Sequence, residues 1–199
     1  MHRTLLFIFL SIIVLGTNSF PQTFGIGGGL SIVTGPDTYT KSYNSGGVGY
    51  SDGYHFGAKL KIDFPLLPIT PVGFVTYSRY SGDELTTNGT IRTSQSIWSI
   101  GAGGEYELFL APSISPYIAA DLSYNNFGDF KSENPVNEIG IIGQSLIGGS
   151  KVGGAIGIGA EVIYHFDLSI KYQFLNWIGK EPGEETVSVM NFNLTLLIF

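Results

Sequence analysis

Apolar and polar side chains alternate along the last fourteen residues of the chain, and this pattern strongly limits what the chain can fold into. One face of the segment from Thr186 to Phe199 is apolar and the other is polar, with Met190, Phe192, Leu194, Leu196 and Ile198 on the first and Asn191, Asn193 and Thr195 on the second. A period of two is the pattern of a β-strand. A strand that ends the chain in this way predicts a sheet closed against its own first strand, because closure leaves no free edge.

Seven earlier segments show the same alternation, so we predict eight strands. They cover residues 23–34, 50–64, 70–80, 93–110, 116–126, 151–166, 167–177 and 186–198. Each can supply the ~9–11 residues that a tilted transmembrane strand needs. The predicted fold class is therefore all-β, an eight-stranded antiparallel up-and-down transmembrane β-barrel.

The connections between these segments alternate in length. Short ones lie at residues 65–69 and 111–115 and at the reversal Phe166–Asp167, and long ones at 35–49, 81–92, 127–150 and 178–185. Bacterial barrels have short periplasmic turns and longer extracellular loops. The sorting predicts that both chain ends lie in the periplasm and that the long loops lie outside the cell.

The numbering of the apolar face agrees from segment to segment. Even positions are apolar, as at Ile26, Leu60 and Ile158, whereas odd positions carry glycines and the charged strand residues. A Lys or Arg facing mid-bilayer lipid costs roughly 2–4 kcal/mol, so we expect even positions to face lipid and odd positions to face the lumen. Aromatic residues near the strand ends fit interfacial girdles, among them Tyr50, Tyr54, Tyr80, Trp98, Tyr124 and Trp177.

The beginning of the chain predicts export. Arg3 precedes an uncharged apolar run from Leu5 to Leu15 and then small or polar residues, so we assign residues 1–19 to a cleaved signal peptide and residues 20–199 to the barrel domain. Without Arg3 the chain has nine basic residues against sixteen acidic ones, a net charge of −7, which argues against nucleic acid as a partner. The absence of cysteine excludes disulfides and thiolate catalysis.

With these features the chain resembles the small eight-stranded outer-membrane barrels of the OmpA/OmpX type over essentially its whole length after the signal peptide. The resemblance implies a place in the cell outer membrane, contact with its lipid and lipopolysaccharide, and insertion by the barrel insertion machinery through a signal that includes Phe199. One departure is that Phe199 falls on the odd register, whereas Ile198 and Leu196 hold the even one. Either a bulge shifts the end of the strand or Phe199 lies at the periplasmic rim.

Other motifs favour structural roles. The glycine-rich run 25–29 lacks the following helix and the Lys-Ser/Thr of a phosphate-binding loop, and lumen-facing glycines make room for long side chains. His55 and His165 lie in separate strands with no second ligand at metal-binding spacing, so we predict no metal and no cofactor. Ser169 follows His165 by four residues, but both face away from lipid, so a lipid-modifying hydrolase is a minor alternative.

The odd positions predict one cluster of charges inside the barrel. If the turns are centred at Phe166 and Ser113, Glu161 faces Lys171 and Glu105 faces Asp121. Two opposed carboxylates repel, so either a cation lies between them or one of them keeps its proton. We predict a lumen network that blocks water flow, in which three cations neutralise three carboxylates: Lys59, Lys171 and Arg79 with Glu105, Asp121 and Glu161.

We expect no enzymatic activity and a structural or interaction role of a monomer through its long loops. Candidate contact residues are Tyr39, Tyr43, Phe127 and Phe130, and no motif identifies their partner. Eight strands leave an interior that side chains just fill, so a plugged polar lumen is favoured, with a narrow pore or a lateral path for small apolar solutes as the alternative. A secreted lipocalin-like barrel with an apolar interior is less favoured, because only 13% of the residues are charged.

Overall fold

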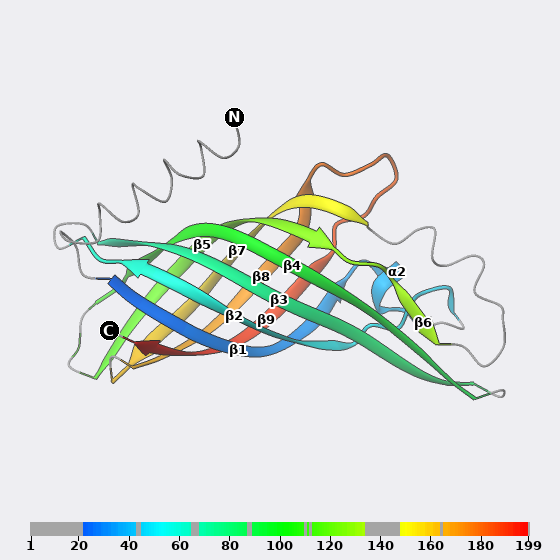
Figure 1. Ribbon diagram of the computed structural model, residues 1–199, viewed down its shortest axis with the longest axis horizontal. Coiled ribbons are helices and arrows are strands. Elements are labelled where there is room, and N and C mark those ends of the chain that lie inside the picture. Colours follow the sequence, from blue (N-terminus) through cyan, green and yellow to red (C-terminus); the bar gives the residue numbers. More distant parts are fainter. Residues whose placement is uncertain are drawn as a thin grey trace, which may run out of the picture.

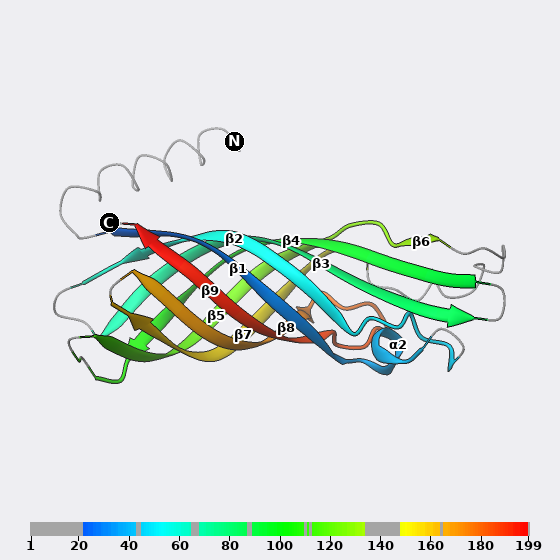
Figure 2. The ribbon, with the colours of Figure 1, turned by 90° about the horizontal axis from the view of Figure 1, so that it is seen from below.

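Eight long antiparallel strands form a closed barrel (Figures 1 and 2). The computed structural model describes residues 22–42, 45–64, 68–86, 89–109, 111, 113–133, 148–163 and 165–198. The barrel strands are β1 (Gln22–Gly35), β2 (Asp52–Ile62), β3 (Ile69–Thr86), β4 (Gly89–Glu107), β5 (Ile114–Phe127), β7 (Gly149–Val162), β8 (Phe166–Ile178) and β9 (Ser188–Ile198). A short helix, α2 (Asp37–Thr40), follows β1, and a short strand, β6 (Lys131–Glu133), follows β5.

Each barrel strand pairs with its neighbours in the chain, and β1 pairs with β9 to close the sheet. Figure 2 shows these first and last strands side by side, with the C-terminal end of β9 at the end of the barrel where β1 begins. In the described part of the chain, no helix is both long and apolar enough to cross a membrane. The predicted signal peptide, residues 1–19, and the insertion-signal residue Phe199 lie outside the described residues.

The hairpin of β3 and β4 differs from the sequence prediction. Residues 81–92 were expected to form a loop, but most of them continue the two strands, with pairs from Ser81 opposite Ser94 to Thr86 opposite Gly89. In Figure 1 this hairpin runs past the other strands at the end that carries α2 and β6. Outside the membrane a strand needs no apolar face. The alternation of apolar and polar residues therefore ends before the hydrogen-bonded strands do.

Seven strands have the faces that the sequence predicts. Even-numbered side chains on β1, β2, β4, β5, β7, β8 and β9 point outward, except beyond a register shift at the loop end of the β7–β8 pair, where Asn176 is buried and Trp177 is exposed. Large apolar side chains are exposed on this outward face, as at Ile26, Phe56, Ile100, Leu122, Ile158, Ile170 and Leu194. Polar odd-numbered residues such as Ser31, Glu105, Asp121 and Asp167 are buried inside. The interior is therefore polar and the wall apolar, which makes the lipocalin-like interpretation wrong.

Strand β3 has the opposite parity. Lys59 pairs with Phe74, and Phe74 pairs with Gly101, so even positions of β3 share the lumen face with odd positions of β2 and β4. Arg79 consequently points outward and is exposed, and its predicted place in the lumen network is wrong. The sequence could not reveal this change, because apolar residues such as Val72 and Val75 lie on both faces of β3.

Candidate functional site

A buried ionic cluster lies in the lumen near the short-turn end of the barrel. Lys59 on β2 reaches Glu105 on β4 at 3.3 Å and also forms a salt bridge with Asp167 on β8. Lys61 lies 2.6 Å from Glu105 and also contacts Glu161 on β7. The side chains of Glu105 and Asp167 are almost completely inaccessible. The cluster thus joins strands on opposite sides of the barrel.

Tyr117 and a second ion pair extend the cluster. The hydroxyl of Tyr117 on β5 donates to Oδ1 of Asp167 at 2.7 Å, and Nζ of Lys61 lies 5.5 Å from the centre of the Tyr117 ring. Tyr117 reaches Asp167 across Gly159, where an added Cβ would lie 2.4 Å from Cζ of the tyrosine. Closer to mid-barrel, Lys171 binds Asp121 at 2.6 Å.

The structure brings together five of the six predicted network residues, although not in the predicted pairs. The predicted register was wrong at both turns, since Glu161 faces Asp167 and Glu105 faces Ala119. Sequence analysis missed two members, Lys61 and Asp167. Lys61 lies on the odd face and could have been found by parity alone, whereas Asp167 had been assigned to a turn that the chain makes at residues 163–165.

A second polar network surrounds His55 at mid-barrel. Gly29 on β1 lies between His55 on β2 and Asn193 on β9, and His55 Nε2 reaches Asn193 Oδ1 across it at 2.8 Å. Nδ1 of the same ring lies 2.8 Å from Ser31 Oγ, which donates to Asn191 Oδ1 at 2.7 Å. An added Cβ at Gly29 would lie 1.7 Å from the carbonyl oxygen of Phe192. This glycine therefore provides the space in which the network forms.

Between the ionic cluster and the loop end lies a polar cavity of about 110 Å³. Its lining includes His55, Ser99, Ser123, Lys171 and Asn193. Oγ of Ser123 is buried without a hydrogen-bond partner among the described residues. A polar cavity of this size can hold several water molecules.

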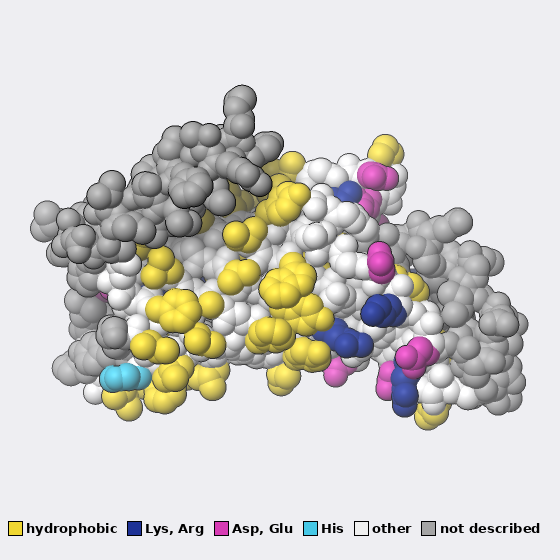
Figure 3. Space-filling view, viewed as in Figure 1, with side chains coloured by type: hydrophobic (Ala, Val, Ile, Leu, Met, Phe, Trp, Pro, Cys, Tyr) yellow, Lys and Arg dark blue, Asp and Glu magenta, His cyan; other side chains and the backbone are white. Residues whose placement is uncertain are grey.

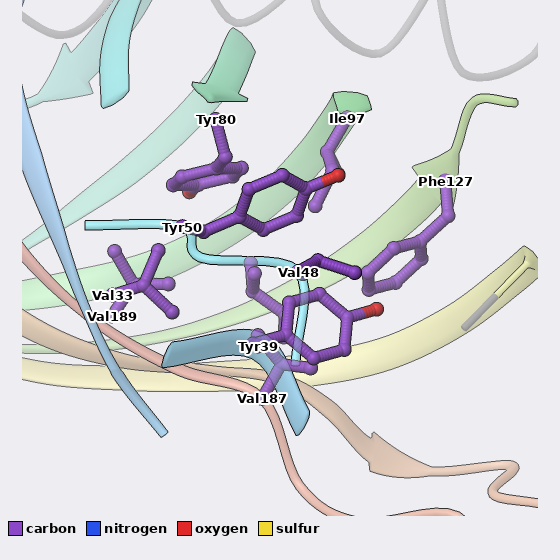
Figure 4. Packing of buried hydrophobic residues seen from close by; sticks show 10 residues of the cluster. Val33, Tyr39, Val48, Tyr50, Tyr80, Ile97, Phe127, Val187 and Val189 are labelled. Carbon is purple, nitrogen blue, oxygen red and sulfur yellow. The ribbon is translucent and has the colours of Figure 1, made fainter. Parts of the chain in front are cut away.

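An apolar cluster lies in the lumen at the loop end. The β1–β2 connection folds into the mouth of the barrel and places Tyr39, Val48 and Tyr50 against strand residues (Figure 4), namely Val33, Tyr80, Ile97, Phe127, Leu175, Val187 and Val189. The rings of Tyr39 and Tyr50 meet edge to face at 5.6 Å, and Thr93 Oγ1 donates to the carbonyl oxygen of Val48 at 2.7 Å. Burial raises the pKa of the Tyr50 hydroxyl above its ordinary value.

This cluster corrects two predictions. Tyr39 and Phe127, expected as exposed contact residues, are buried in it, and Phe130 packs against it. Tyr50 and Tyr80, expected in the outer aromatic girdle, are also inside. Tyr43 lies outside the described residues. A loop with its own buried side chains folds into the barrel because burial removes their apolar surface from water.

Three carboxylates of the ionic cluster lie close together, whereas His165 and Ser169 lie in different surroundings. Glu105, Glu161 and Asp167 each offer an oxygen within 4.8 Å of the others, but Lys59 and Lys61 already bridge these carboxylates. His165 is exposed at a short turn, where its Nδ1 lies 2.7 Å from the carbonyl oxygen of Ile163, whereas Ser169 is buried in the lumen.

The outer wall is apolar around the middle of the barrel and charged at the loop end. Figure 3 shows hydrophobic side chains over the mid-section, and Lys, Arg, Asp and Glu gathered toward the end with α2 and β6. Trp98 and Tyr77, whose ring centroids are 5.1 Å apart, lie at the boundary. An apolar band flanked by aromatic residues is the surface of a protein that crosses a bilayer with its strands.

A family model described as "Outer membrane protein beta-barrel domain" matches residues 6–197. The chain belongs to this family. Its barrel is therefore an integral outer-membrane barrel, and by the general topology of such barrels the short turns lie in the periplasm. The closed sheet, the apolar wall and the polar interior described above are features expected of an outer membrane protein beta-barrel domain.

Solved structures of similar fold include two that exceed a TM-score of 0.5. The outer membrane enzyme PagL matches with a TM-score of 0.55 and 15% identity over 87% of this chain and 98% of PagL. Neisserial surface protein A matches with a TM-score of 0.52 and 16% identity over 89% of this chain and 95% of that protein. At these low sequence identities the likeness shows a shared fold and nothing more. No curated protein sequence matches this chain closely enough to indicate a relative.

Proposed function

We propose that this barrel is a surface interaction protein that acts through the sheet projecting from its loop end and conducts no solutes. The observation that carries this proposal is the continuation of β3 and β4 beyond their neighbours, since β2 pairs only as far as Ser81 and β5 only as far as Ile97. Strand β6 pairs with residues 92–94 of β4 and widens the projection. Leu85 at its tip is 84% exposed.

Buried clusters at the two ends of the lumen support the same proposal. The ionic cluster lies at one end and the apolar cluster at the other, and we infer that together they block the passage of solutes. A lateral path would need a gap in the wall, but pairing is continuous between β4, β5 and β7, as at Gly104, Ala120 and Ile156. We therefore favour the outer surface over the interior as the functional part.

The Ser31–His55 contact does not favour an enzyme. A hydrolase needs a nucleophile that its substrate can reach, and Ser31 is completely buried. Its Oγ also donates to Asn191. We infer a structural role for this network, which an ester-hydrolysis assay with phospholipid and lipopolysaccharide substrates tests directly.

The decisive experiment shortens the projection without disturbing the barrel. Because Gly82 faces Thr93, residues 83–92 can be replaced by Asn-Gly, which forms a two-residue hairpin turn. Thr90→Ser is the control that keeps the hairpin at full length and leaves the exposed Leu85 at its tip unchanged. Adhesion of expressing cells to a panel of immobilised proteins and polysaccharides should fall to background with the shortened hairpin and persist with the control.

Conductance in planar bilayers tests the closed lumen separately. The proposal expects no channel steps from the purified wild-type barrel, and uptake of small solutes into vesicles at the rate of empty vesicles. Regular conductance steps would support the narrow pore. Unchanged adhesion after shortening would contradict the role of the projecting sheet.

A further inference from the structure

The basic residues of the outer wall are confined to one place. On the described strands, Lys59, Lys61, Lys151 and Lys171 point into the barrel and pair with carboxylates. The outward-facing cations are Arg79 on β3, Arg92 on β4 and Lys131 on β6, three strands that pair in the order β3–β4–β6. Arg92 lies 3.9 Å from Asp83, farther out along the hairpin.

Arg79 and Lys131 have no acidic partner among the residues that the structure describes. Within the described residues, every other Lys or Arg except Lys180 has a carboxylate within 4.0 Å. Both unpaired residues adjoin Ser94, since Arg79 donates to Ser94 Oγ at 3.4 Å and Lys131 is the register partner of Ser94. Ser96, the register partner of Arg79, adds a second hydroxyl on the same outward face.

This pair lies directly above the apolar wall. One step below Arg79 on the outward face of β3 is Tyr77, whose ring contacts Trp98 and Phe56. Tyr54, the register partner of Arg79 on β2, is also exposed. Aromatic residues of this kind mark the level of the headgroups. Figure 3 shows basic side chains bordering the hydrophobic region at the loop end.

We propose that Arg79, Lys131, Ser94 and Ser96 form a binding site for the phosphate of a phosphorylated glycolipid in the outer leaflet. A guanidinium and an ammonium with hydroxyl groups beside them provide the donors that a phosphate monoester accepts. The tyrosine and tryptophan rings below would contact the same molecule where its headgroup meets its acyl chains. The site depends on membrane placement and not on the adhesive role of the projecting sheet.

Binding of purified bis-phosphorylated lipid A to the barrel in detergent micelles, followed by native mass spectrometry, tests the site. The variant Arg79→Gln/Lys131→Gln should bind roughly 30-fold more weakly than wild type, from two lost charges near a lipid headgroup. Lys180→Gln removes another exposed cation without a carboxylate partner and should bind as wild type does. Heat-dependent gel mobility verifies that each variant is folded.

Two further arms identify the ligand. Wild type should bind enzymatically dephosphorylated lipid A no more tightly than the double variant binds intact lipid A. Inorganic phosphate at millimolar concentration should not displace lipid A, because the acyl chains contribute to binding. Equal binding by the double variant, or equal binding of dephosphorylated lipid, overturns the proposal. Displacement by phosphate overturns the assignment to a lipid.

Discussion

The two ends of the lumen hold clusters of different physical kinds. At the short-turn end only strand residues take part, and lysines and carboxylates from β2, β4, β7 and β8 neutralise one another. At the loop end, residues of the β1–β2 connection supply an apolar cluster. The barrel wall thus determines the first cluster, whereas the second depends on how a loop folds. Substitutions at the two ends should therefore differ in size and kind.

The largest effect is expected at the ionic end. Lys59→Met leaves Glu105 and Asp167 without one of their cations and should lower the free energy of unfolding by about 3–5 kcal/mol, as for other broken buried pairs. Urea unfolding in lipid vesicles, followed by tryptophan fluorescence, measures this. Lys180→Met in an exposed loop is the control, and an equal loss in both variants would mean that the buried charges are hydrated.

A somewhat smaller effect is expected at the apolar end. Tyr50→Ala removes a completely buried ring and should cost about 3 kcal/mol. Because the defect lies in a loop, proteolysis of the β1–β2 connection should accelerate while the strands stay intact. Tyr54→Ala, on the lipid face nearby, serves as the comparison. Unchanged proteolysis in Tyr50→Ala would show that the cluster does not hold the loop.

Tyr117→Phe separates the hydrogen bond from the ion pairs at the ionic end. The ring stays over Lys61, but Asp167 loses one donor, so the cost should be about 1–2 kcal/mol. The same urea titration measures it. A loss as large as that of Lys59→Met would mean that the hydroxyl, and not the lysine, organises the cluster.

The smallest effect is expected on the projecting hairpin. Arg92→Gln breaks an exposed contact with Asp83 and should change the free energy of unfolding by less than about 1 kcal/mol. Repeating the titration at high salt should abolish even this difference, because exposed pairs are screened. A persistent loss at high salt would indicate that the hairpin supports the barrel.

The difference between the two ends also explains what could be predicted from the sequence. The alternation identified eight strands, the outward face of seven of them, and most members of the ionic cluster, because lipid forbids charge on one face. It failed where that constraint is weak. Strand β3 carries apolar residues on both faces, so the orientation of Arg79 could not be derived. The β4–β5 and β7–β8 turns were misplaced by one or two residues, and this error changed the predicted cross-strand partners on these strands.

The loop end was not predictable for a different reason. Tyr39, Val48 and Tyr50 lie in a segment without periodicity, and only tertiary contacts show that they point into the barrel. The networks around Gly29 and Gly159 required the strand register as well, since a glycine acquires a role only when the long side chains on either side of it are known. Parity, in contrast, was sufficient to place Lys61 inside.

The ion pairs of the lumen connect segments that are far apart in the chain. Lys59 is separated from Asp167 by 108 positions, and Lys61 from Glu161 by 100. A partly assembled sheet that contains β2 but not yet β7 and β8 would have to carry two lysines without these partners. Such intermediates are disfavoured in lipid. Strands β7 and β8 therefore stabilise β2 when they join the sheet. Assembly of this barrel should consequently be strongly cooperative, with closure and neutralisation of the interior completed in one step.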